Sequence, residues 1–342
     1  MAYHFKNLVF EGGGVKGIAY VGALEVLDKE GILPNIKRVA GTSAGAMVAV
    51  LVGLGYTAKE LRDILWGLNF TEFLDDSFGK IRDTERLIKE YGWYQGDFFR
   101  NLMADYIKNK TGDGEVTFKD LKDSKKFKDI YLIGTDLSTS YTKVFCHEFT
   151  PNVKVADAAR ISMSIPLFFK AVQNINNDHH VYVDGGLLDN YPIKVFDRVS
   201  YVLDENNERR TEYYEKTNKS LKNKYKRIND YVYNKETLGF RLDAKEEIEK
   251  FLDPDRELPI KNDIKTIFSY SKALVTTLID FQNNVHLHSD DWQRTIYIDS
   301  KNVSAVDFEI SDAKKRLLVE SGINGTTEYL KWYNGDEPKA NK

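Results

Sequence analysis

The sequence predicts an α/β fold with a mainly parallel β-sheet. Three observations lead to this prediction. Short apolar runs with strand character alternate with helical patterns over residues 1–56, strand-like runs return in residues 128–149 and 179–184, and another follows at residues 294–300. Strands that alternate with helices in this way are typical of helices packed on a parallel sheet.

The first part of the chain predicts a βαβα unit. Residues 4–11, HFKNLVFE, have the composition of a first strand. Residues 15–31 follow with apolar side chains at helical spacing, and this helix is expected to end at Gly31. Residues 36–41, IKRVAG, predict the second strand, and the run of small residues after it predicts a buried helix.

The rest of the chain changes in texture along its length. Residues 58–125 are helical in pattern and rich in aromatic side chains. Charges of both signs and recurring tyrosines set residues 204–265 apart, and we expect a helical insertion or cap there. The other expected elements are strands at 128–139, 143–149 and 179–184, a helix in 155–169 that Pro166 ends, a helix at 267–285, a strand at 294–300 and a helix at 311–333.

The expected organisation is one core that is interrupted once. Residues 1–203 form its main part, the charged segment 204–265 is the insertion, and residues 266–333 complete the same domain. Residues 334–342 are expected to form a disordered tail. No linker rich in Ser, Gly or Pro marks a domain boundary.

Charge and cysteine content argue against several classes of protein. The formal net charge is −3, whereas nucleic-acid-binding proteins usually show a basic surface. Cys146 is the only cysteine, so no intrachain disulfide can form. The N-terminus lacks the pattern of a secretory signal, and the most apolar run, residues 39–55, is short for a membrane span. We therefore expect a cytoplasmic location with peripheral and transient membrane contact.

Three glycines follow the first strand in the stretch EGGGVKG. Gly12, Gly14 and Gly17 fit the G-x-G-x-x-G spacing of dinucleotide-binding loops. Such a site expects an acidic residue at the end of the second strand, but that strand runs into VAGTSAG, which has no carboxylate. A P-loop is also excluded, because Lys16 is followed by Gly17 and not by Ser or Thr.

The second strand ends instead in GTSAG, residues 41–45. This is a G-x-S-x-G pattern at a strand-to-helix turn, which is the context that a nucleophile elbow requires. The turn is sharp, so small residues must flank the serine, and Gly41 and Gly45 meet that need. Ser43 Oγ is expected to project above the sheet at the positive end of the following helix. The pattern therefore predicts Ser43 as a nucleophile.

The glycine run would then supply hydrogen-bond donors. Acyl transfer builds negative charge on a carbonyl oxygen, and preorganised N–H groups stabilise that charge. Glycines expose their N–H groups without side-chain obstruction, and loops after parallel strands meet at one edge of the sheet. We therefore predict an oxyanion hole at Gly12, Gly13 and Gly14, beside Ser43.

Two kinds of base are open for this serine. Asp184 ends a strand before two glycines, and burial would raise the pKa of its carboxyl group so that it accepts a proton. Alternatively, Ser43, Asp184 and His286 or His288 follow the order of an α/β-hydrolase triad. Against the triad, these histidines lie in a polar stretch with no glycine turn to fix them.

Together these motifs resemble the pattern of the patatin-like phospholipase family. The resemblance spans about residues 5–200, and the charged segment is the least family-like part of the chain. Four elements carry it, in the family's order: Gly12-Gly13-Gly14-Val15-Lys16-Gly17, Gly41-Thr42-Ser43-Ala44-Gly45, the S-x-x-x-P run from Ser162 to Pro166, and Asp184-Gly185-Gly186.

The resemblance implies a three-layer α/β/α fold whose catalytic core is residues 1–203. It also implies a Ser43–Asp184 dyad that hydrolyses carboxylic esters of phospholipids or other acyl lipids without histidine, metal or cofactor. In that scheme Ser43 attacks the ester carbonyl, Asp184 takes and returns the proton, and an acyl-enzyme is released by water. Lys16 either attracts a phosphate head group or is simply solvated.

Other interpretations stay open at the level of sequence. Phe98, Phe99 and Phe168 either line an acyl channel or belong to the core. The same fold could serve as a non-hydrolytic lipid-binding module, although a module has no need of both Ser43 and Asp184. The sequence specifies neither the lipid head group nor the oligomeric state.

Overall fold

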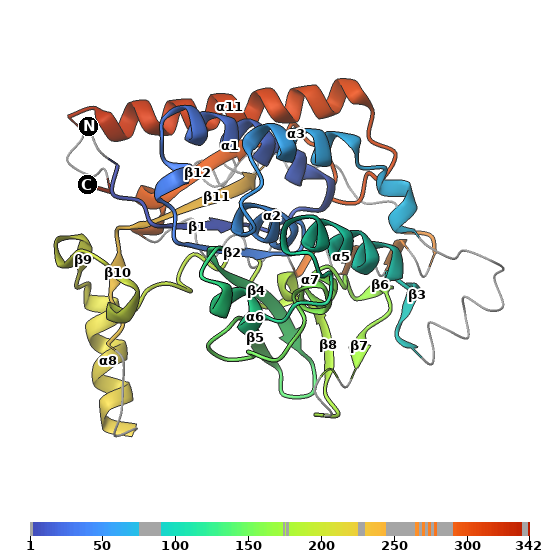
Figure 1. The fold of residues 1–342 in the computed structure, drawn as a ribbon, viewed down its shortest axis with the longest axis horizontal. Coiled ribbons are helices and arrows are strands. Elements are labelled where there is room, and N and C mark those ends of the chain that lie inside the picture. Colours follow the sequence, from blue (N-terminus) through green and yellow to red (C-terminus); the bar gives the residue numbers. More distant parts are fainter. Residues whose placement is uncertain are drawn as a thin grey trace.

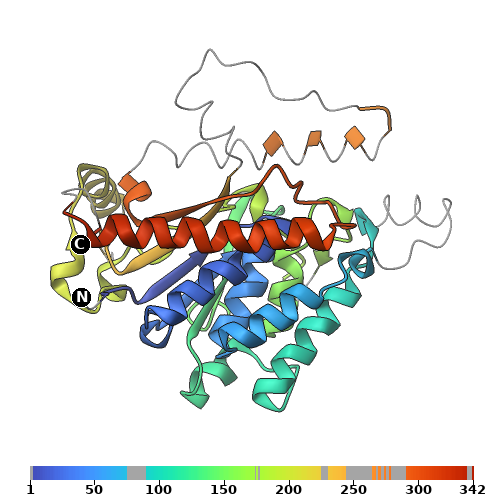
Figure 2. The same ribbon diagram turned by 90° about the horizontal axis from the view of Figure 1, so that it is seen from above.

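The fold is centred on one twisted β-sheet that is flanked by helices (Figures 1 and 2). A computed structural model describes residues 3–74, 90–173, 175, 178–224, 230–243, 264–266, 269–270, 273–274, 277–278, 290–336 and 341–342.

The strands of the main sheet lie in the order β12-β11-β1-β2-β4-β8-β7, and β5 pairs with β4 beside this path. The strands from β12 to β4 are parallel to one another, whereas β5, β7 and β8 join as antiparallel partners. Their bounds are β1 Asn7–Phe10, β2 Arg38–Thr42, β4 Asp129–Asp136, β5 Tyr141–Phe145, β7 Val172–Gln173, β8 Val181–Asp184, β11 Thr237–Asp243 and β12 Thr295–Asp299.

The register of these strands brings three loops to one edge. Phe10 pairs with Gly41, and Thr42 pairs with Ile133, so β1 and β2 end at the same level as the middle of β4. The antiparallel strand β8 ends at Asp184, which pairs with Gly134 at that level. The loops after β1, β2 and β8 therefore meet at one edge of the sheet.

The helices form because apolar side chains and caps coincide. The helix α2 is buried along nearly its whole length, which explains its run of small and aliphatic residues. Capping boxes begin α3 at Thr57 and α6 at Thr117. The bounds are α1 Ala19–Lys29, α2 Ala44–Gly53, α3 Ala58–Gly67, α5 Asp97–Thr111, α6 Phe118–Ser124, α7 Val155–Ser162, α8 Glu212–Lys224 and α11 Asp312–Asn334.

The two faces of the sheet are covered differently. In β1, Leu8 and Phe10 point into the main core, under α1, α2 and the long α11 (Figure 1). Val9 points to the other face and packs with a smaller cluster that includes Tyr191 and Phe196. An α/β fold with a mainly parallel sheet flanked by helices is thus confirmed.

The structure differs from the sequence prediction within residues 204–265. The helix α8 and the short strands β9 (Glu208–Arg209) and β10 (Tyr233–Asn234) belong to a peripheral unit, and α8 projects from the body in Figure 1. In contrast, β11 is a buried strand of the main sheet that pairs with β1 and β12. Its Arg241 and Asp243 gave it the composition of a surface segment, because a charge pattern does not reveal charges that pair inside the core.

Two other expectations also need correction. The helix expected in 155–169 ends at Ser162, and Leu167–Phe169 forms the strand β6, which pairs with β3 (Gly92–Tyr94). At the end of the chain, Asn341 is buried and its amide donates to the Lys235 carbonyl at 2.7 Å, so this part of the expected disordered tail is packed.

The helix expected at 267–285 lies largely outside the described residues. Among the described helices, none has the length and apolarity needed to cross a bilayer.

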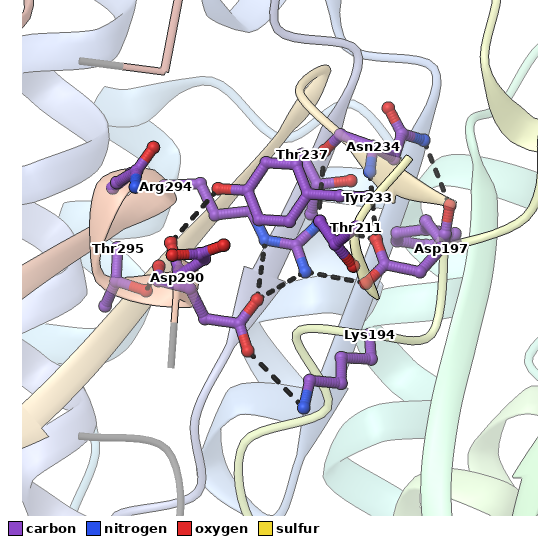
Figure 3. A network of polar contacts seen from close by, with 12 residues as sticks. Lys194, Asp197, Thr211, Tyr233, Asn234, Thr237, Asp290, Arg294 and Thr295 are labelled. Atoms are coloured by element: carbon purple, nitrogen blue, oxygen red, sulfur yellow. Dashed lines mark hydrogen bonds and ion pairs between the residues drawn. The ribbon is translucent and has the colours of Figure 1, made fainter. Parts of the chain in front are cut away.

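A buried charge network attaches the peripheral unit to the core (Figure 3). The Arg294 guanidinium, fully buried, donates to both carboxylate oxygens of Asp197 at 2.6 and 2.7 Å and to Asp291 at 2.6 Å. It also stacks on the ring of Tyr233 in β10, 4.1 Å from the ring centroid. The hydroxyl of Tyr214 in α8 donates to Asp197. The guanidinium thus joins its own segment directly to Asp197 and Tyr233, and it is joined to α8 through Asp197.

We predict that Arg294→Ala lowers the free energy of unfolding by about 3–5 kcal/mol, because two buried carboxylates lose their cation. Urea denaturation at pH 7 measures this change. The control is Arg210→Ala, which removes the ion pair between Glu208 and an Arg210 side chain that is 59% exposed. This substitution should lower the free energy of unfolding by about 1 kcal/mol or less. Equal effects of the two substitutions would contradict the role given to the buried network.

Candidate active site

The turn between β2 and α2 holds Ser43 in a strained conformation. Its φ is 54° and its ψ is −126°, a region that non-glycine residues rarely adopt. The flanking glycines permit the turn: a Cβ atom on Gly41 would lie 2.2 Å from the Gly45 carbonyl oxygen, and one on Gly45 would lie 2.4 Å from the Phe10 carbonyl oxygen. The geometry is that of a nucleophile elbow.

A second serine fastens this turn to the sheet. The Ser43 N–H donates to Ser162 Oγ at 2.9 Å, and the Ser162 hydroxyl donates to the Ile133 carbonyl at 2.5 Å. Ser162 is the last residue of α7 and is fully buried. The S-x-x-x-P run that was noted in the sequence therefore acts through its serine, which links the elbow to β4.

Asp184 lies buried at the end of β8, beside the elbow. Its Oδ1 accepts the Gly186 N–H at 2.7 Å, whereas its buried Oδ2 has no hydrogen-bond partner among the described residues. Burial raises the pKa of Asp184 to about 7, against the opposing effects of the Gly186 N–H and the Ser43 hydroxyl. The Ser43 hydroxyl itself contacts Met163 Sδ at 3.7 Å. The carboxyl group is therefore close to the serine and retains an unused oxygen.

The glycine loop after β1 lies directly against the elbow. A Cβ atom on Gly12 would lie 3.0 Å from Ser43 Cβ, and one on Gly17 would lie 3.2 Å from Ala44 Cβ. Gly14 has a φ of 54°, and a Cβ atom there would lie 1.9 Å from the Ala305 carbonyl oxygen. The loop therefore needs glycine both for its conformation and for close backbone approach.

The N–H groups of this loop differ in their use. The Gly12 N–H donates to the Asn190 carbonyl at 3.0 Å, so it is already occupied. The N–H groups of Gly13 and Gly14 donate to no group within the described part of the chain. Gly12 therefore differs from Gly13 and Gly14, because its N–H group already has an acceptor within the loop after β8.

Lys16 and the residues of the D-G-G motif lie around this centre. Burial raises the pKa of Glu11, the residue before the glycine loop, to about 7, and the positive charge of the partly exposed Lys16 acts in the opposite direction. Gly185 packs on β4, where a Cβ atom would lie 2.5 Å from the Ile133 carbonyl oxygen. Gly186 supplies the N–H that holds Asp184.

Two connecting residues escaped the sequence analysis. The Thr42 hydroxyl donates to the Asp189 carbonyl at 2.9 Å, which ties the elbow to the loop after β8. Asn190 bonds to Gly12 through both its backbone and its side chain. A polar residue that precedes Tyr-Pro in a loop carries no periodic signal, so only its position in the fold reveals this function.

A narrow apolar cavity of about 30 Å³ opens beside Ser43. It lies between α2, α3 and the segments around residues 163–169 and 305–308. The residues that line it are Gly14, Val15, Gly17, Ile18, Ser43, Ala44, Met47, Val48, Leu65, Leu68, Phe70, Phe73, Met163, Ile165, Phe169, Ala305 and Phe308. Phe98, Phe99 and Phe168 do not line this cavity and belong to the core or pack against it.

His180, which lies just before β8, is paired away from the serine. His180 Nδ1 pairs with Asp136 Oδ2 at 2.7 Å, and no contact joins His180 to Ser43 in the described structure. His286 and His288 lie outside the described residues. Within the described ranges, no three His, Cys, Asp or Glu side chains are grouped as metal ligands.

The fold and the site define a class of α/β proteins that hold a serine at a strained strand-to-helix turn. Comparison with known proteins specifies the family. The family model for patatin-like phospholipase matches residues 8–197. The protein YqhO of Bacillus subtilis is 31% identical over 334 residues, which cover 94% of this chain and 97% of that protein. The chain belongs to the patatin-like phospholipase family.

Two further comparisons agree with this assignment. The cGAMP-activated phospholipase of Vibrio cholerae is 25% identical over 210 residues, which cover 55% of this chain and 57% of that protein. The crystal structure of VipD from Legionella pneumophila superposes with a TM-score of 0.57 at 17% identity, and the match covers 97% of this chain and 67% of that one. This structural likeness supports the fold alone.

The raised pKa of Asp184 has a consequence for stability. The carboxyl group binds its proton more tightly in the folded state, with a pKa of about 7, than in the unfolded state, near 3.8. Its contribution to stability is full below pH 3.8 and is lost as the pH rises through 7. We predict that Asp184→Asn is more stable than the wild type at pH 8 by roughly 2–4 kcal/mol, and that the difference vanishes near pH 4.

Urea denaturation at pH 4, 6 and 8 measures this trend. Asp120→Asn is the matched control, because the pKa of Asp120 is lowered by its hydrogen bonds to Thr117 at the start of α6. That substitution should destabilise the protein by nearly the same amount at all three pH values, because the contribution of Asp120 is lost only below its unfolded pKa of 3.8. A constant offset between Asp184→Asn and the wild type across this range would show that the Asp184 carboxyl is not perturbed.

Proposed function

We propose that this protein is a lipid acyl hydrolase that cleaves carboxylic esters through Ser43 and Asp184. The observation that carries the proposal is the apolar cavity that opens at Ser43, with a buried carboxyl group of raised pKa beside the same serine. The apolar lining of this cavity suits an acyl chain and offers little to a polar substrate. Family membership and the phospholipase name of the Vibrio relative support the same reaction class.

The first half-reaction forms an acyl-enzyme. Ionised Asp184 accepts the Ser43 hydroxyl proton through its unused Oδ2 while Oγ attacks the ester carbonyl carbon. The carbonyl oxygen becomes an oxyanion, and the N–H groups of Gly13 and Gly14 donate to it. When the tetrahedral intermediate collapses, the C–O bond breaks and protonated Asp184 returns the proton to the leaving alcohol.

The second half-reaction repeats these steps with water. Asp184 takes a proton from water as the water oxygen attacks the acyl-enzyme, and the proton returns to Ser43 Oγ as the fatty acid leaves. The pKa near 7 suits both directions of transfer at neutral pH. We further propose that the substrate is a phospholipid or another acyl lipid, reached by peripheral contact with a membrane.

We predict that Ser43→Ala and Asp184→Asn each reduce ester hydrolysis by at least about a thousand-fold. Fatty-acid release from mixed phospholipid vesicles, resolved by mass spectrometry, measures this loss and identifies the ester position. Ser140→Ala, which changes an exposed serine in the β4–β5 turn, is the matched control and should leave the rate unchanged. Circular dichroism checks that each variant is folded.

Contrary outcomes separate the alternatives. Near-normal turnover by Asp184→Asn, together with loss of turnover in His286→Asn or His288→Asn, would replace the dyad with a triad. Binding of lipid vesicles without any fatty-acid release, from wild type as from Ser43→Ala, would favour a non-hydrolytic lipid-binding module. Labelling of wild type by a fluorophosphonate, absent in Ser43→Ala, tests the nucleophile independently of the lipid.

The cavity wall predicts how chain length is limited. Leu65 lines the cavity from α3, and a larger side chain there would shorten the space available to an acyl chain. We predict that Leu65→Trp lowers kcat/KM for a C16 p-nitrophenyl ester by about ten-fold or more relative to a C4 ester. Leu61→Trp, one turn earlier on the same helix and outside the cavity lining, controls for overpacking. A parallel loss on both esters in Leu65→Trp would place the acyl chain elsewhere.

A further inference from the structure

Asn190 forms hydrogen bonds with both the N–H group and the carbonyl group of Gly12, the first glycine of the loop. The Asn190 carbonyl accepts the Gly12 N–H at 3.0 Å, and Asn190 Nδ2 donates to the Gly12 carbonyl at 3.1 Å. The side chain lies so close that a Cβ atom on Gly12 would be 2.4 Å from Asn190 Oδ1. Asn190 is 2% exposed and lies six residues after Asp184 in the loop that follows β8.

The hydrogen bond from Asn190 to the Gly12 carbonyl also orients the N–H group of Gly13. The Gly12 carbonyl and the Gly13 N–H belong to one planar trans peptide unit, so they point in opposite directions. When the Asn190 amide holds the carbonyl, the Gly13 N–H is directed to the other side of the loop. The Gly13 N–H is one of the two donors that our mechanism assigns to the oxyanion.

Glu11 fixes the direction of the amide itself. Its Oε1 accepts from Asn190 Nδ2 at 3.4 Å, and its Oε2 accepts the Leu242 N–H at 2.6 Å. An acceptor at this position requires the NH₂ group of Asn190, and not its oxygen, to face the glycine loop. Burial raises the pKa of Glu11 to about 7, and the buried guanidinium of Arg241, whose Nε lies 3.9 Å from Glu11 Oε1, opposes this shift by favouring the ionised carboxylate.

The glycine loop has few other constraints. Glycine has the largest conformational freedom of all residues, and three in succession have no side chains with which to anchor themselves. Leu242 packs against Gly13, where a Cβ atom would lie 2.6 Å from its Cδ1, and Ala305 closes over Gly14. The Gly13 carbonyl accepts the Lys16 N–H at 3.1 Å, which directs the Gly14 N–H by the same rule. None of these contacts sets the direction of the Gly13 N–H.

We propose that Asn190, oriented by Glu11, is a positioning residue that aims the Gly13 N–H at the oxyanion. This inference rests on the proposed function, because it concerns the same Ser43 reaction. It assigns to the loop after β8 a second task besides carrying Asp184. It also predicts a specific defect, in which tetrahedral intermediates are bound less well while the acyl pocket is unchanged.

The test compares two ligands of the same site. A long-chain alkyl trifluoromethyl ketone adds Ser43 Oγ to its carbonyl and forms an oxyanion, whereas palmitate occupies the acyl pocket without forming one. We expect Asn190→Ala to weaken the inhibition constant of the ketone at least ten-fold and to lower kcat in proportion. The Kd for palmitate and the KM for the ester should change less than two-fold.

Asn234→Ala is the matched control. Asn234 is equally buried and its amide also donates to a backbone carbonyl, that of Phe196 at 3.0 Å, but it lies in the peripheral charge network. It should cost comparable stability and leave both ligand affinities unchanged. Glu11→Gln is the second variant, because an NH₂ group in place of one oxygen leaves one of the two donors without an acceptor. Glu11→Gln should also weaken ketone binding, and it tests the positioning role of Asn190 if Asn190→Ala does not fold.

Each outcome bears on one proposal. Unchanged ketone affinity in the folded variants overturns the positioning role. Equal loss of ketone and palmitate affinity also overturns it, since a merely structural role would affect both ligands. If the wild type does not form the ketone adduct, or forms it equally in Ser43→Ala, the proposed function fails, independently of Asn190.

Discussion

The constraint on which the site depends is the strained backbone at Ser43. A serine at φ 54° is held against its own preference, at a cost of order 1–3 kcal/mol. The neighbouring glycines make the turn sterically accessible, and the hydrogen bond from the Ser43 N–H to Ser162 holds it. Because the Ser162 hydroxyl donates to the Ile133 carbonyl of β4, the strained turn is anchored to the sheet. The Ser43 hydroxyl then lies beside Asp184 and the cavity.

The site is assembled from three loops that are far apart in sequence and adjacent in the sheet. The register of β1, β2, β4 and β8 brings them to one edge, and a few polar contacts then lock them together. Thr42 joins the elbow to the loop after β8, and Asn190 joins that loop to the glycines. Backbone carbonyls are the acceptors in both contacts, so the assembly depends on main-chain geometry more than on matched side chains.

The buried carboxyl groups of Asp184 and of the Arg294 network differ in their surroundings. Burial raises the pKa of Asp184 to about 7, and no cation among the described residues pairs with it, so its ionised form costs stability. Asp197 and Asp291 are paired with Arg294, so their charges stabilise the attachment of the peripheral unit (Figure 3). The two cases differ in whether a guanidinium lies beside the buried carboxylate, as Arg294 does beside Asp197 and Asp291.

The sequence by itself determined the α/β class, the elbow at Ser43 and the glycine loop, because these features depend on local patterns of strand, turn and glycine. It also pointed to Asp184, since a carboxylate before two glycines marks a strand end. The place of β11 in the sheet, the tie through Ser162, the occupied N–H of Gly12 and the grip of Asn190 were decided by tertiary structure alone. Each of these is a contact between residues more than a hundred positions apart, and local sequence carries no signal for the partner that burial and sheet register bring to a polar group.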